Sequence, residues 1–142
     1  MSVRRYVPAF LAFLASATAF AQSTNYTSVE AVAGTVAQIG YYASAKKDCA
    51  PAPLPTIRVL TPPKHGILSI RRGTVTTNRV ANCPSLQTPA QVVFYQGNAD
   101  YQGADELAYE VTSSNGEIGV YNISVAVKPA VTPAPTTPGQ RL

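Results

Sequence analysis

The sequence predicts an all-β protein, an immunoglobulin-like antiparallel β-sandwich of about seven strands with one disulfide. The stretch Val93–Val111 (VFYQGNADYQGADELAYEV) joins an extended run, a turn rich in Gly, Asn and Asp, and a second run whose side chains alternate between two faces. About seven short runs of this kind, separated by turn residues, follow one another along the chain. Two cysteines supply one cross-link. Together these observations indicate a small sandwich of two sheets.

The N-terminal segment, residues 1–21, has the features of a secretory signal peptide. Arg4 and Arg5 precede an apolar stretch over residues 6–14, and small residues follow, with a cleavage site predicted after Ala21. The apolar stretch is too short to cross a membrane, and no second long apolar segment follows it. We therefore expect a periplasmic or secreted protein, exported through a cleaved signal peptide, with no membrane span.

The remainder of the chain is expected to form one small domain, residues 22–129, followed by a tail. Two of the 11 basic residues lie in the signal peptide, which leaves nine against seven acidic residues and a weakly positive domain. Its core is expected to rest on Phe94, on tyrosines and on Val, Ile and Leu. Residues 130–142 are rich in Pro and Thr, with few core-forming side chains, which predicts a disordered tail.

The strands are predicted from alternating polarity and from the turns between them. Ser28–Ile39 is apolar at alternate positions with a Gly break, which predicts one or two strands, although its alanines also allow a helix. Further strands are expected at Thr56–Leu60, Ile67–Arg71, Thr74–Thr77, Gln91–Tyr95, Glu106–Thr112 and Ile118–Lys128. Turns are expected at Lys64–Gly66, Arg72–Gly73 and Ser113–Gly116, the last with the hairpin signal Asn-Gly.

Cys49 and Cys83 are expected to form a disulfide, because an exported chain with two cysteines most simply pairs them in an oxidising compartment. Closing a loop of this length contributes on the order of 3 to 4 kcal/mol in the chain-entropy description. A reactive thiol or a metal pair is the alternative. Neither cysteine lies in a CxxC motif or near a histidine with ligand spacing, which favours the structural disulfide.

Asp105 and Tyr109, with Val111 two residues further on, have the spacing of a tyrosine corner. In such a corner the hydroxyl of a buried tyrosine pins a loop by a hydrogen bond. Val111 stands where antibody domains carry a cysteine, and the chain has no Trp, so an antibody-type domain is excluded. The spacing therefore supports a sandwich of the immunoglobulin class without supporting membership of the antibody family.

The chain also resembles the bacterial immunoglobulin-like and cadherin-like repeats of secreted adhesins, here as a single copy over about Ile57 to Lys128. Their pattern P-x-H-G-x-[VL] is followed by a segment spaced by Tyr, Gly, Asp and Tyr, and by a final V-x-V strand. The matching positions are Pro63, His65, Gly66, Leu68, Tyr95, Tyr101, Gly103, Asp105, Leu107, Tyr109, Val111 and Ser124–Val127. The resemblance implies a β-sandwich used for binding.

Residues that could carry catalysis or bind a metal are few. His65, the single histidine, has no partner at catalytic or metal spacing and is expected to stabilise its turn by bonding to nearby backbone. Asp100, Asp105 and Glu106 could supply oxygens to Ca²⁺, but structural roles account for them. We therefore expect no enzyme activity, no metal site and no cofactor, with a small hydrolase as the least favoured reading.

Two candidate ligand surfaces emerge from the sequence. Lys64, Arg71, Arg72 and Arg79, with Tyr101, form a possible patch for anionic envelope polymers, although a merely solvated face is the favoured interpretation of the basic residues. Several tyrosines could stack on sugar rings, although amphipathic sheet positions also account for them. They are Tyr26, Tyr41, Tyr42, Tyr101 and Tyr121.

The sequence therefore predicts a non-catalytic module that binds a protein or polysaccharide of the cell envelope. A structural or accessory subunit of an envelope assembly, working through strand pairing, is the alternative. Nucleic acid is excluded as a partner, because the net charge without the signal peptide is low and export removes the chain from nucleic acid.

Overall fold

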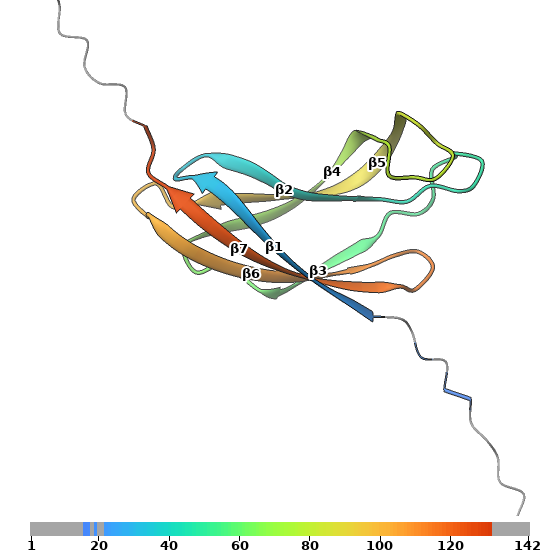
Figure 1. The fold of residues 1–142 in the computed structure, drawn as a ribbon, viewed down its shortest axis with the longest axis horizontal. Helices are drawn as coiled ribbons and strands as arrows, with labels where there is room; N and C mark the ends of the chain where they lie inside the picture. Colours follow the sequence, from blue (N-terminus) through green and yellow to red (C-terminus); the bar gives the residue numbers. More distant parts are fainter. Residues whose placement is uncertain (1–15, 18, 20–21, 132–142) are drawn as a thin grey trace, which may run out of the picture.

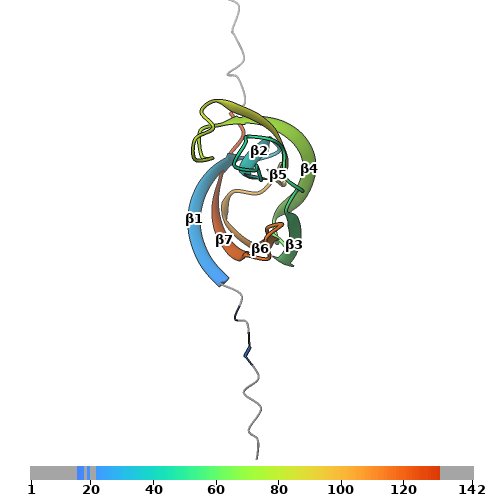
Figure 2. The ribbon, with the colours of Figure 1, turned by 90° about the vertical axis from the view of Figure 1, so that its right-hand side faces the viewer.

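The computed structural model describes residues 16–17, 19 and 22–131, and in this part of the chain it contains seven β-strands and no helix. The strands are β1 (Gln22–Val32), β2 (Val36–Ala43), β3 (Thr56–Thr61), β4 (Gly66–Thr77), β5 (Leu86–Gly97), β6 (Gly103–Thr112) and β7 (Ile118–Lys128) (Figure 1). They form a four-stranded sheet in the order β1-β7-β6-β3 and a three-stranded sheet in the order β2-β5-β4. An end-on view shows the two sheets curving around a shared interior (Figure 2). The all-β sandwich and its number of strands are confirmed.

One pairing departs from the antiparallel expectation. β1 runs parallel to β7, with Gln22 opposite Ile118 and Val32 opposite Lys128, while every other pair of neighbouring strands is antiparallel. The chain then turns at Gly34, which has a φ of 75°, and enters the other sheet as β2. Because β1 and β7 point the same way, the start of β1 and the end of β7 lie at opposite ends of the sandwich (Figure 1).

One strand prediction is confirmed and one turn prediction is wrong. Ser28–Ile39 falls in two strands, β1 and β2, with a turn between them, and the alternative of a helix is not found there. The turn expected at Arg72–Gly73 was wrong, since β4 continues through it and Gly73 pairs with Ala90 of β5. Glycine is a weak strand residue on its own, but the unbroken ladder between β4 and β5 overrides that local preference.

The core is formed by inward-facing residues of both sheets, which alternate with exposed positions along β5, β6 and β7. Tyr95 and Tyr109 are fully buried in it and are its largest side chains. The other buried members are Ala31, Ala33, Val93, Leu107, Val111, Ile123, Val125 and Val127. Phe94, expected in the core, is only half-buried and lies on the outer face, with the Arg71 guanidinium 5.7 Å from its ring centroid. The expected tyrosines and aliphatic residues therefore form the core, and only the placement of Phe94 was wrong.

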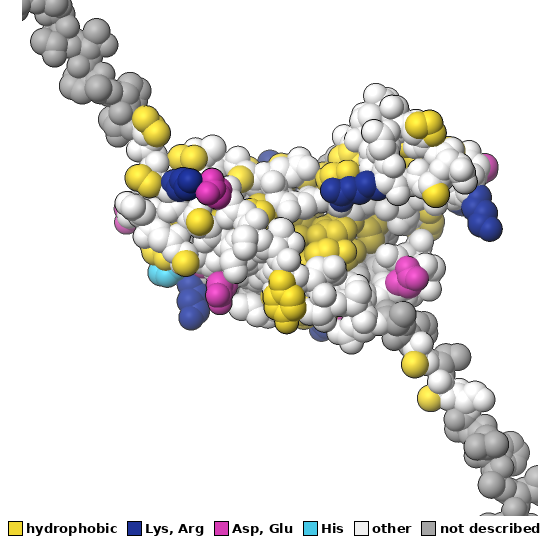
Figure 3. Space-filling view, in the orientation of Figure 1, with side chains coloured by type: hydrophobic (Ala, Val, Ile, Leu, Met, Phe, Trp, Pro, Cys, Tyr) yellow, Lys and Arg dark blue, Asp and Glu magenta, His cyan; other side chains and the backbone are white. Residues whose placement is uncertain are grey.

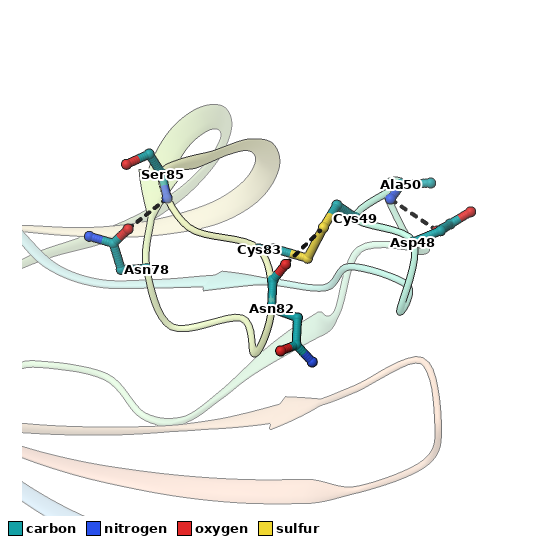
Figure 4. The surroundings of a disulfide bond; sticks show 7 residues. All are labelled: Asp48, Cys49, Ala50, Asn78, Asn82, Cys83 and Ser85. Atoms are coloured by element: carbon teal, nitrogen blue, oxygen red, sulfur yellow. Dashed lines mark hydrogen bonds between the residues drawn. A yellow bond between two sulfur atoms is a disulfide. The ribbon is translucent and has the colours of Figure 1, made fainter.

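The predicted disulfide is present. Cys49, in the loop between β2 and β3, is joined to Cys83, in the loop between β4 and β5, with their Cα atoms 5.7 Å apart (Figure 4). Within the second loop, Asn78 Oδ1 accepts a hydrogen bond of 2.6 Å from the Ser85 amide (Figure 4). The bond thus links the two loops that extend beyond one end of the sandwich.

Candidate functional site

The structure does not bring the basic residues of the predicted patch together. Lys64 precedes β4 and Arg79 follows it, so they lie at opposite ends of a strand that spans about 36 Å. Arg71 and Arg72 are neighbours on β4 and therefore point to opposite faces of the sheet. Arg71 lies over Phe94 on the outer face, whereas Arg72 borders a groove beside the loop that carries Cys49. The four cations do not make one surface.

Tyr101 pairs with His65, far from Arg79. The two rings stack with their centroids 3.9 Å apart and their planes 5° apart. The turn bonds expected of His65 come from its main chain, since its amide donates to Asp105 and its carbonyl accepts from the Asn98 amide at 2.9 Å. The imidazole itself contributes stacking.

Asp105 fastens this end of the sandwich. Its side chain is 3% exposed and accepts hydrogen bonds from the Lys64 and His65 amides, both at 3.0 Å, and from the Tyr95 hydroxyl at 2.8 Å. It also accepts from the amide of Glu106. Burial raises the pKa of Asp105, but these hydrogen bonds favour the carboxylate and together leave the pKa below its ordinary value. Asp105 therefore pins the loop before β4, the function that a tyrosine corner assigns to tyrosine.

Tyr109 forms part of a different arrangement. Its hydroxyl is 2.7 Å from the hydroxyl of Tyr42 on β2, in the opposite sheet. Its ring stacks on Tyr121 of β7 with centroids 5.5 Å apart, and Tyr121 in turn lies 4.9 Å from the Tyr42 ring. Tyr42, Tyr109 and Tyr121 thus form one group of three rings across the two sheets, here termed the tyrosine cluster.

The tyrosine cluster is uncharged. Burial, followed by the hydrogen bond with Tyr109, raises the pKa of Tyr42 above its ordinary value. Burial likewise raises the pKa of Tyr109, although the hydrogen bond with Tyr42 lowers it in part. Both hydroxyls stay protonated at neutral pH and bond to each other, and only Tyr42 is partly exposed.

The tyrosine cluster lines a groove of about 700 Å³ at the disulfide end of the sandwich. Tyr41 and Arg79 also line it, with the guanidinium 4.6 Å from the Tyr41 ring centroid. Ser23 and Thr27 of β1 line one side, and the turn between β6 and β7 contributes Ser113 and Glu117. A hollow with hydrophobic side chains between the two sheets is visible in the space-filling view (Figure 3). We refer to it as the tyrosine groove.

The sequence of β1 explains why the sandwich is open here. Thr27 pairs with the buried Ile123, and Val29 with the buried Val125, so odd-numbered residues of β1 face inward. In the second half of β1 this face carries Val29 and Ala31, which belong to the core. In the first half it carries Ser23, Asn25 and Thr27, whose polar groups are costly to bury without hydrogen-bond partners. The apolar interior therefore gives way to a solvated groove.

Two glycines make room for the rings. A Cβ atom at Gly40 would lie 2.9 Å from the Tyr109 hydroxyl and 3.1 Å from the Tyr42 hydroxyl. At Gly119, a Cβ atom would lie 3.0 Å from Tyr121 Cε2. Any larger side chain at either position would displace a member of the tyrosine cluster, so the shape of the tyrosine groove depends on both.

Of the five tyrosines considered for stacking, the structure brings three to the tyrosine groove. Tyr41, Tyr42 and Tyr121 line it, together with Tyr109, which had been assigned to the corner. Tyr26 points away from the groove on β1 and is 81% exposed, and Tyr101 lies at the other end with His65. The adjacent pair Tyr41-Tyr42 was the one local sequence feature that pointed to an accessible tyrosine. Neighbouring residues of a strand face opposite sides of the sheet, so one of the two rings must lie outside the core.

The described residues contain neither a metal-binding cluster nor a membrane-spanning helix. No group of three or more His, Cys, Asp or Glu side chains in residues 16–17, 19 and 22–131 is placed to hold a metal ion. Within the same residues, no helix is long and apolar enough to cross a membrane. Most of the predicted signal peptide and most of the predicted tail lie outside the described residues.

Comparisons with known proteins place the chain in no family. No protein-family model matches it, and no curated protein matches its sequence. The solution structure of amebosin is similar to 75% of this chain and 98% of its own, with 9% sequence identity and a TM-score of 0.39. At this level the similarity supports no argument about function.

Proposed function

We propose that this protein is an exported, immunoglobulin-like, non-catalytic binding module whose tyrosine groove holds an extended segment of a cell-envelope protein. The observation that carries the proposal is the position of the tyrosine groove between the free edges of the two sheets. β1 is the outermost strand of one sheet and β2 the outermost strand of the other, and residues of both line the groove. An extended segment in this position can bond to main-chain groups of an edge strand and place side chains on the rings.

A protein segment suits the groove better than a sugar chain. Sugars bind to free, flat aromatic faces. Here the Tyr121 ring packs against Tyr109 and against the inclined Tyr42 ring, and the Arg79 guanidinium lies over Tyr41. The uncharged hydroxyl of the half-buried Tyr42 suits carbonyl and amide groups of a peptide backbone, whereas that of the fully buried Tyr109 is bonded to Tyr42. Capture of a polysaccharide alone in the experiment below would therefore contradict the proposal.

Three observations support the other parts of the proposal. β2, β5 and β4 form one sheet while β3, β6 and β7 lie in the other, the division of strands B, E, D and C, F, G in immunoglobulin sandwiches. The Cys49–Cys83 disulfide fits an oxidising compartment, as the predicted signal peptide requires. The single histidine lies stacked on Tyr101 at the end remote from the tyrosine groove, which favours binding over catalysis there.

The same free edges favour a second candidate, a structural subunit that joins an envelope assembly by strand pairing. The two candidates differ in stoichiometry and reversibility. A binding module releases its ligand and is recovered as free protein, whereas a subunit is recovered from the envelope in a fixed ratio to its neighbours. Extraction of the native protein under mild conditions distinguishes them.

The proposal is tested by capture from envelope extract with oxidised protein at low and high salt. Two single variants on β1 provide a matched pair. Thr27→Arg fills the tyrosine groove, whereas Tyr26→Arg places the same side chain on the opposite, exposed face of the same strand. We expect a protein partner that is retained at high salt, lost with Thr27→Arg and kept with Tyr26→Arg. Equal capture by both variants, or capture of polysaccharide alone, contradicts the proposal.

A further inference from the structure

We propose that the tyrosine groove binds the proline-rich segment 132–142 of a second copy of this chain, so that copies associate head to tail. The inference rests on the proposed function and names a specific extended segment as occupant. That segment reads TPAPTTPGQRL. Proline-rich segments favour the polyproline II conformation, which exposes its backbone carbonyls and binds to grooves lined by aromatic side chains.

The spacing of the prolines fits such a groove. Polyproline II has three residues per turn, so a segment bound in that conformation would present Pro135 and Pro138 on one ridge. Tyr42 and Tyr121, with ring centroids 4.9 Å apart at an interplanar angle of 57°, present a tilted aromatic surface rather than one flat face. A ridge of proline rings can pack against this uneven surface. Tyrosine hydroxyls can donate hydrogen bonds to the exposed carbonyls between the prolines.

The ridge of Pro135 and Pro138 cannot lie on the rings of its own copy, although Pro138, which extends about 31 Å beyond Lys128, could reach the groove alone. Tyr121 lies near the start of β7, and the chain leaves β7 at Lys128, about 23 Å further along the strand. Pro135 is seven residues beyond Lys128 and extends at most about 22 Å in polyproline II, before any residue is used to reverse direction. A second copy avoids this limit, because its tyrosine groove is lined by residues at the start of β7, whereas the segment leaves from the opposite end of that strand in the first copy.

Charge gives the bound segment a direction. Glu117 lies at the mouth of the tyrosine groove and is exposed, and it belongs to neither of the two ion pairs in the described residues, Arg58–Glu110 and Lys128–Glu30. Arg141 follows Pro138 by three residues and can reach Glu117 when the proline ridge lies on the rings. Arg79, on the opposite rim, repels Arg141 and so disfavours the reverse orientation.

An arrangement of this kind is heterologous, because two different surfaces meet. Each copy offers one groove and one segment, so association continues from copy to copy instead of stopping at a symmetric dimer. Concentration-dependent growth in molecular mass is therefore the expected signature, in contrast to a single dimer step.

The test uses sedimentation of the full oxidised chain over a range of concentrations. We expect the mean mass to rise with concentration, and Pro135→Ala with Pro138→Ala to weaken association by about tenfold or more. Arg141→Glu and Glu117→Arg should each weaken it by roughly two- to fivefold, as for exposed ion pairs, and the double variant should recover the loss. Thr27→Arg should abolish association, while Tyr26→Arg should leave it unchanged.

A synthetic peptide of residues 129–142 provides a second readout. We expect it to shift the NMR signals of the Tyr42 and Tyr121 rings and to reduce the mass of the associated protein. A protein that stays monomeric at high micromolar concentration, with no response to the peptide, overturns the inference. If envelope capture still depends on Thr27 in that case, the proposed function stands and only the choice of occupant fails. If groove-dependent capture is also lost, both fail.

Discussion

Replacement of Asp105 by Asn should destabilise the protein in a way that depends on pH. Oδ1 of Asp105 accepts from the amides of Lys64 and Glu106, and Oδ2 accepts from the His65 amide and the Tyr95 hydroxyl. An asparagine must keep its oxygen at the first position, since its NH₂ group would otherwise meet two N–H donors. At the second position Tyr95 can rotate to accept, but the His65 amide is left without a partner.

The magnitude follows from this count. One buried, unpaired N–H costs about 1 to 3 kcal/mol, and the remaining bonds become weaker when the acceptor loses its charge. We therefore expect Asp105→Asn to lower the free energy of unfolding at pH 7 by about 3 kcal/mol, a large share of the 5–15 kcal/mol typical of a domain. Tyr95→Phe, which removes one donor and keeps the carboxylate, is the matched control and should lose about 1.5 kcal/mol.

The pH dependence has a definite sign. Because the pKa of Asp105 is lower in the folded protein, the carboxylate contributes its full stability above the unfolded pKa of about 3.9, and the contribution is lost as pH falls through the folded pKa. The difference between wild type and Asp105→Asn should therefore be largest at pH 7 and shrink below about pH 4. Urea unfolding followed by circular dichroism at pH 7 and pH 3 measures it. A difference below 1 kcal/mol at pH 7, or one that is the same at both pH values, refutes this account.

Three other changes have expected outcomes in the same unfolding assay. Replacing Cys49 and Cys83 together by Ser should cost about 4 kcal/mol, because the disulfide closes a loop with a sequence separation of 34, and a loss under 1 kcal/mol contradicts this. Gly66→Ala should cost about 2 kcal/mol, because its Cβ would lie 2.7 Å from a backbone oxygen of β5. Gly73→Ala, on the same strand with its nearest contact at 3.5 Å, should change stability by less than about 0.5 kcal/mol, and equal losses would refute the steric argument. Tyr42→Phe should cost about 1 kcal/mol through the lost hydroxyl pair, and an unchanged stability would show that this bond contributes nothing.

The strands could be predicted because their evidence is local. Alternation along Glu106–Thr112 and Ile118–Lys128 corresponds to β6 and β7, with β6 starting three residues earlier. The Arg72–Gly73 prediction failed because a glycine signals a turn only when no neighbouring strand holds it, and here β5 does. The disulfide followed from the cysteine count alone.

Asp105 and Tyr109 show where local spacing stops being informative. Both face inward on β6, four residues and thus about 13 Å apart along the strand, so each must find its partner elsewhere. The partners are Tyr95 and Tyr42, which lie on β5 and β2 of the opposite sheet. Which residues of two sheets face each other depends on packing that no motif in one segment records. The tyrosine groove could not be predicted for the same reason.

The two ends of the sandwich differ in how they are held together, and this difference bears on binding. At one end a buried carboxylate joins the loop before β4 to β5 and β6. At the other end the interior opens into the tyrosine groove, where the Cys49–Cys83 bond and the hydroxyl pair of Tyr42 and Tyr109 replace apolar packing. Because the Tyr42–Tyr109 bond joins the two sheets beside the groove without a ligand, a segment that enters the groove meets rings whose positions are already fixed. Preorganisation of this kind lowers the entropic cost of binding, so a short segment with few contacts can still bind measurably.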